Sequence, residues 1–196
     1  MGYFTYRLFQ SVSLPRLRSK VKANLALYER GTIGCQSSVH LLQGNGCTAL
    51  WMDNLTGQEQ YLRPLGLQFG CVWMDVRYQD GDTWDLSLYE GPDHRCSHSV
   101  YPWAHEERYR PRPDHIAYRI NRVCEYWPRV AARLQPYLLL WRMPIRRHGR
   151  VRWMPRPGKA HPDDRHPYGD AEQIYDVLRV FGIGEHSRRC TVQPKS

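Results

Sequence analysis

The chain has 196 residues, of which 41% are hydrophobic and 12% aromatic, and its formal net charge is +9 at pH 7. This length and apolar content allow one sizeable core, which excludes a disordered chain. A transmembrane helix and a secretory signal are also excluded, because no run of about eighteen apolar residues occurs and the first residues lack an apolar signal region. We therefore expect a single cytoplasmic α+β domain over residues 1–196, with no membrane partner.

Motifs for catalysis or cofactor binding are missing. The six cysteines form no C-x-x-C pair, which argues against a zinc ribbon, and reduced thiols suit a cytoplasmic chain. The sequence contains no glycine-rich phosphate loop and no nucleophile motif. We therefore predict no cofactor and no catalytic residue.

The first third of the chain gives a mixed signal. Residues 3–9 alternate as a strand does, and Val21 and Leu25 follow helical spacing in a helix that Gly31 would end. Residues 32–70 show no clear pattern, although CTALWMD (47–53) could be a strand after a turn at Asn45-Gly46.

The clearest strand pattern lies in residues 71–91. Apolar side chains alternate on either side of Asp80-Gly81-Asp82, and Asp-Gly favours a hairpin turn. A third strand over residues 96–101 would extend the pair. We therefore predict an antiparallel sheet centred on residues 71–101 and packed against C-terminal helices.

The other face of this hairpin carries Asp75, Arg77, Asp85 and Ser87. These side chains are typical of a strand face in contact with water. A site of paired carboxylates, Asp75 and Asp85, is the alternative.

Three helices are predicted in the second half, at about 115–127, 129–141 and 170–181. The last has the strongest signals: Asp170 as N-cap, Gln173 at the capping-box position, and a terminating glycine at 182. Its apolar stripe includes Leu178, whereas Arg179 is expected to be exposed. The tail from about residue 184 is expected to be frayed.

A basic segment at about 142–158 mixes arginines with tryptophans. It is predicted to be either a short hairpin about His148-Gly149 or an exposed loop. Charge for phosphates and rings for stacking are what a single-stranded nucleic acid needs, and a solvated loop anchored by its tryptophans is the alternative. The candidate binding residues are Arg142, Arg146, Arg147, Arg150, Arg152 and Trp153.

The arginine excess has two interpretations. Only four of the 28 basic residues are lysines, and arginine binds carboxylate and phosphate through two parallel hydrogen bonds. A GC-rich genome would give the same bias without a function. The charge favours an acidic partner, which we expect to be a protein, with nucleic acid as the alternative.

Histidine and carboxylate side chains are concentrated in residues 161–166. His161, Asp163 and His166 are candidate metal ligands, because imidazole and carboxylate together suit zinc, manganese or iron. A metal-dependent hydrolase is therefore a third functional class. The alternative is a polar loop before the last helix.

The segments TWDLSLYEG (83–91), PYLLLWR (136–142) and HPYGDAEQIYDVLRVFGI (166–183) together resemble small uncharacterised bacterial α+β proteins, some of the toxin-immunity type. This resemblance implies a compact binding domain and no catalytic mechanism. The expected function is thus a non-enzymatic binding protein, an immunity or regulatory partner of another bacterial protein.

Overall fold

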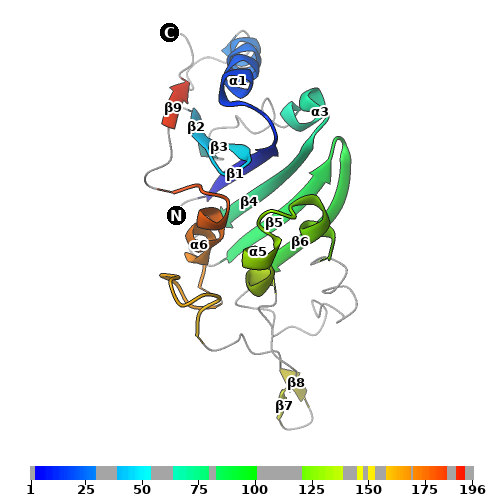
Figure 1. Ribbon diagram of the computed structural model, residues 1–196, viewed down its shortest axis with the longest axis vertical. Helices are drawn as coiled ribbons and strands as arrows, with labels where there is room; N and C mark the ends of the chain where they lie inside the picture. The colour runs from blue at the N-terminus through cyan, green and yellow to red at the C-terminus, as the bar shows by residue number, and fades with distance from the viewer. Residues whose placement is uncertain are drawn as a thin grey trace.

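The computed structural model is drawn in Figure 1. It describes the chain in ten stretches: residues 3–29, 39–53, 64–79, 83–100, 121–138, 145–147, 150–152, 158–168, 170–184 and 189–192.

A seven-stranded antiparallel sheet forms the centre of the molecule, with the strand order β6-β5-β4-β1-β3-β2-β9 (Figure 1). The predicted α+β class is confirmed. The strands are β1 (Tyr3–Gln10), β2 (Val39–Gln43), β3 (Cys47–Asp53), β4 (Val72–Gln79), β5 (Thr83–Glu90), β6 (Asp93–Val100) and β9 (Arg189–Val192).

The predicted meander is confirmed as β4, β5 and β6, although β6 begins three residues earlier than expected. Gly91 makes the second turn at a φ of +54°, a conformation that costs glycine little. The first turn, at residues 80–82, lies outside the described residues. The meander joins the rest of the sheet through β1, which pairs with both β4 and β3.

Residues 39–53 form the β2–β3 hairpin, so CTALWMD is a strand as anticipated. Gly46, with a φ of +72°, supplies the turn between the two strands. Between β1 and β2 in sequence, α1 (Leu14–Glu29) begins earlier than the predicted helix. Pro15 is accommodated because it stands in the first turn, where a backbone N–H has no helical partner.

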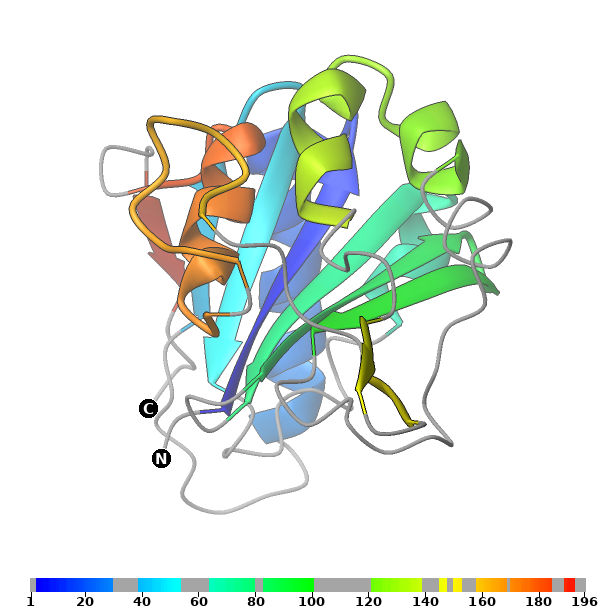
Figure 2. The ribbon, with the colours of Figure 1, turned by 90° about the horizontal axis from the view of Figure 1, so that it is seen from below.

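Helices cover both faces of the sheet. The core under α1 and α3 (Leu65–Phe69) includes Phe9, Leu50 and Trp73. Neighbouring strand positions such as Leu8 and Met74 point the other way, toward α5 (Ala131–Leu138) and α6 (Gln173–Val180), which lie together on one side of the sheet in Figure 2. The expectation of one water-facing sheet surface is therefore wrong for the middle of the sheet.

The C-terminal helices are shorter than predicted. Residues 121–126 are helical, but residues 115–120 and 139–141 lie outside the described residues. In α6 the capping box is not formed: Asp170 Oδ1 accepts from the backbone N–H of Glu172 at 2.8 Å, in a turn that precedes the helix. The side-chain amide of Gln173 is fully buried and makes no hydrogen bond, so it does not bond back to the backbone N–H of Asp170.

The prediction of a frayed tail is wrong for β9. Its backbone pairs with β2, and Val192 is buried in the core under α1. Four residues with two inward-facing positions are enough to hold an edge strand, but they give only a short alternating pattern in the sequence.

Candidate functional site

The basic segment forms a two-stranded ribbon apart from the main sheet. Strands β7 (Ile145–Arg147) and β8 (Arg150–Arg152) are antiparallel, as expected for a hairpin, and residues 148–149 between them lie outside the described residues. In Figure 1 this ribbon lies beyond the lower end of the seven-stranded sheet.

The register of the ribbon sorts its arginines by face. Arg147 is opposite Arg150, and Ile145 is opposite Arg152. Because opposed residues share a face and successive residues alternate, positions 147, 150 and 152 fall on one face and position 146 on the other. The two remaining candidate binding residues, Arg142 and Trp153, lie outside the described residues.

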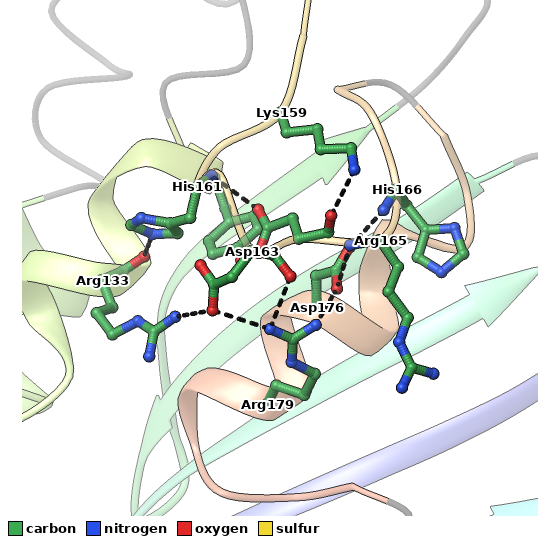
Figure 3. A network of polar contacts seen from close by, with 10 residues as sticks. Arg133, Lys159, His161, Asp163, Arg165, His166, Asp176 and Arg179 are labelled. Atoms are coloured by element: carbon green, nitrogen blue, oxygen red, sulfur yellow. Dashed lines mark hydrogen bonds and ion pairs between the residues drawn. The ribbon is translucent and has the colours of Figure 1, made fainter.

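The segment 158–168 is bound to α5 and α6 by its own carboxylates (Figure 3). Asp164 is buried and accepts hydrogen bonds from the Tyr137 hydroxyl at 2.5 Å and from the backbone N–H of His161 at 2.9 Å. Burial and this carboxylate raise the pKa of Tyr137. Lys159 Nζ donates to the backbone oxygen of Asp164 at 2.7 Å.

Asp176 of α6 holds the other end of the segment. Its buried carboxylate accepts from the backbone N–H groups of Arg165, at 3.1 Å to each oxygen, and of His166, at 2.8 Å. Arg179 Nη1 also donates to it at 3.0 Å. Arg179 is therefore part of the network and only about one-third exposed, contrary to the expectation that it projects into water.

The three candidate metal ligands do not converge. His161 Nε2 lies 2.8 Å from the backbone oxygen of Arg133, and Asp163 forms ion pairs with Arg133 and Arg179. In Figure 3 the ring of His166 lies on the opposite side of the segment from that of His161. No three His, Cys, Asp or Glu side chains within the described ranges are grouped so that they could hold a metal ion.

A buried polar cluster lies on the α1 face of the sheet, where the sequence indicated a solvated surface. Arg7 donates to Asp75 from Nε at 2.6 Å and from Nη2 at 2.9 Å, and both side chains are 1% exposed. Arg77 Nη2 reaches the same carboxylate at 3.3 Å. The solvated interpretation of Asp75 is wrong because the pairing partner stands on β1, 68 residues away.

Asp85 belongs to this polar cluster but is not paired with Asp75 as a catalytic dyad would be. Burial raises the pKa of Asp85, the charge of Arg77 opposes that rise, and the charge of Asp75 adds to it. Both carboxylate oxygens of Asp75 accept a hydrogen bond from Arg7. The cluster therefore joins β1 to β4 through the hydrogen bonds between Arg7 and Asp75 and does not pair the two carboxylates with each other.

Six aromatic side chains form a continuous strip on the α6 face of the sheet, which sequence reasoning missed. Phe4 is central: its ring stacks on Tyr78 at 4.6 Å between centroids and contacts Tyr6, Trp51 and Tyr175 at 5.7, 6.4 and 6.2 Å. His40 contacts Trp51 at 5.1 Å and extends the strip to β2.

Strands β1 to β4 each contribute to this aromatic strip, because alternate side chains of a strand lie on the same face of the sheet. His40, Trp51 and Tyr6 are opposed across β2, β3 and β1, and Phe4 is opposed to Tyr78 on β4. The signal in the sequence was an aromatic residue at the inward-facing positions of four separate strands. It became visible only when the strand order was known.

No helix in the described ranges is both long and apolar enough to cross a membrane. Comparison of the chain with known protein families, with characterised proteins and with solved structures found no match.

Proposed function

We propose that the protein is a non-enzymatic nucleic-acid-binding protein that contacts phosphates through the β7–β8 ribbon. The observation that carries this proposal is the register of the ribbon, which assigns Arg147, Arg150 and Arg152 to one face. A guanidinium binds a phosphate through two parallel hydrogen bonds and remains charged at any physiological pH. The net charge of +9 draws a polyanion to the molecule.

The geometry of the 158–168 segment argues against a hydrolase. Asp164 and Asp176 are buried and occupied by hydrogen bonds that attach this segment to α5 and α6. A general base or a metal ligand needs a free lone pair directed at its substrate or metal. These carboxylates instead act as internal caps for backbone N–H groups.

An acidic protein is the second candidate partner, which would fit an immunity or regulatory role. Ile145 shares the face of the three arginines by register, and an apolar residue among arginines is common at the centre of protein interfaces. Both candidates suit the cytoplasm, where thiols stay reduced. The described thiols of Cys47, Cys71, Cys124 and Cys190 form no disulfide.

Fluorescence anisotropy with labelled single-stranded DNA and RNA tests the proposal. The ribbon variant replaces Arg147, Arg150 and Arg152 with Gln. Its matched control removes the same charge from exposed positions of α1, namely Arg18, Lys20 and Lys22. We expect the ribbon variant to lose affinity at least tenfold more than the control, because the ribbon positions contact phosphates and these α1 positions do not.

Two results would count against the ribbon proposal, and thermal unfolding serves as the control for both. Equal losses in the two variants would mean that binding follows total charge, and the ribbon proposal would be wrong. Binding to polyglutamate with no binding to either oligonucleotide would favour the acidic protein. Thermal unfolding of each variant shows that the fold is unchanged.

A further inference from the structure

The aromatic strip consists of His40, Trp51, Tyr6, Phe4, Tyr78 and Tyr175, and its rings are not part of the closed core. Trp84 and Phe9, which are core rings, are 0% exposed, whereas the five strip residues on the sheet are half-buried. Tyr175 of α6 is 42% exposed and is one of two large exposed hydrophobic residues in the described ranges. The strip residues are therefore partly accessible to solvent along four strands.

The arrangement of the rings suits flat ligands that repeat along a chain. The strip runs across β2, β3, β1 and β4, roughly perpendicular to the strands, and neighbouring strands in a sheet are about 4.8 Å apart. Tyr175 rises beside Phe4 from α6, with the two rings tilted by 31° at a centroid distance of 6.2 Å. His166 adds a further ring at 6.4 Å from Tyr175.

We propose that the aromatic strip stacks unpaired bases of a single-stranded nucleic acid, with Tyr175 as its exposed edge. Every base has a flat face that an aromatic ring can cover, so stacking needs no particular sequence. Sheet aromatics that stack successive bases are a known means of holding single-stranded RNA. The charge of +9 favours this polyanion over a neutral sugar chain, which aromatic rings also bind.

This inference rests on the proposed function because both need a nucleic acid, but it concerns a different surface. The ribbon would supply charge and the strip would supply ring contact. The two contributions respond differently to salt, since phosphate contacts release counterions and stacking does not. The salt dependence of binding therefore distinguishes the effect of a ribbon variant from that of a strip variant.

The test compares four variants by anisotropy, using a labelled oligothymidylate and a duplex of equal length. Tyr175→Leu keeps an apolar side chain but removes the ring, and Tyr175→Phe keeps the ring. Leu67→Ala removes the other exposed hydrophobic residue, on α3 at the opposite face of the sheet. Trp51→Leu provides a second position within the strip.

We expect Tyr175→Leu and Trp51→Leu to weaken binding of the single strand by about 5- to 150-fold with an unchanged salt slope. Tyr175→Phe and Leu67→Ala should bind as the original chain does, and the duplex should bind more weakly than the single strand. The inference is overturned if Tyr175→Leu binds normally, if Tyr175→Phe loses as much as Tyr175→Leu, or if the duplex is bound equally well.

The failures of the two proposals are distinguishable. If strip variants bind normally while ribbon variants lose affinity, the strip inference is wrong and the proposed function stands. If ribbon variants bind normally while Tyr175→Leu does not, the ribbon proposal is wrong and the strip inference stands. Retention of a neutral oligosaccharide with no oligonucleotide binding would overturn both.

Discussion

Arg7 of β1 and Asp75 of β4 face each other in the register of the sheet and are joined by two hydrogen bonds, at 2.6 and 2.9 Å, in a setting where each side chain is 1% exposed. The guanidinium of Arg7 also lies 4.8 Å from the centre of the Trp73 ring. The pair therefore ties the N-terminal strand to the central meander in a place that water does not reach.

Removing one partner of this pair should strongly destabilise the folded protein. We expect Asp75→Leu to lower the free energy of unfolding by about 3–5 kcal/mol, because it removes both hydrogen bonds that the buried guanidinium of Arg7 donates to this carboxylate. Arg7→Met should cost less, because Arg77 still reaches the carboxylate of Asp75. The double variant should recover much of the loss, since both charges are gone. Urea unfolding of all four proteins gives the coupling energy, and additive losses in the double variant would show that the two side chains do not act as a pair.

Two neighbouring positions in α6, Leu178 and Arg179, should both lower stability when replaced with alanine, for different physical reasons. Leu178→Ala should cost roughly 2–5 kcal/mol, because the side chain is buried against the sheet. Arg179→Ala should also be costly, by about 1.5–3 kcal/mol, since it removes charged hydrogen bonds to Asp176 and Asp163. Lys22→Ala, at an exposed position of α1, is the control, with a change within about 0.5 kcal/mol. An Arg179→Ala variant as stable as this control would contradict the network of Figure 3.

Gln173 should tolerate loss of its polarity. Its side chain is fully buried, and neither Oε1 nor Nε2 has a hydrogen-bond partner. An unpaired buried amide costs about 1–3 kcal/mol, so Gln173→Met, which has a similar shape, should leave stability unchanged or raise it. Thermal unfolding checks this, and a loss of more than about 1 kcal/mol would mean that the amide is satisfied in solution.

Stability should fall at alkaline pH because of Cys47. Burial raises the pKa of its thiol from 9.0 to about 12, so above pH 9 the unfolded chain releases a proton that the folded chain keeps. The contribution of the protonated Cys47 thiol to the free energy of unfolding is therefore fully present below pH 9. It is lost toward pH 12, by up to about 1.4 kcal/mol per pH unit. Urea unfolding from pH 9 to 11 should show a shallower decline for Cys47→Ala. The control is Cys190→Ala, which removes a half-buried thiol from the edge strand. Equal slopes for Cys47→Ala and the original chain would contradict the burial of this thiol.

Local patterns in the sequence predicted the parts of the fold that depend on local physics. The meander follows from alternation around Asp80-Gly81, and α6 follows from its apolar stripe before Gly182. The antiparallel pairing of β7 with β8 agrees with the hairpin, one of the two structures predicted for the basic segment. In each case the residues that decide the structure are neighbours in the chain.

The remaining features depend on partners that are remote in sequence. Nothing near Asp75 in the sequence indicates that Arg7 pairs with it, so the local pattern predicts a solvated strand position. Val192 is inward-facing only because β2 offers an open edge. The aromatic strip is drawn from four strands and one helix, and no single segment shows more than two of its six residues.

The salt dependence of oligonucleotide binding tests the central claim most directly. If Arg147, Arg150 and Arg152 each contact a phosphate, log affinity for a single strand should fall with log salt, and replacing all three with Gln should flatten that slope by about two units. The α1 control, with Arg18, Lys20 and Lys22 replaced, should keep the original slope. Absence of binding by the original chain at low salt, or one slope shared by all three proteins, would contradict the account.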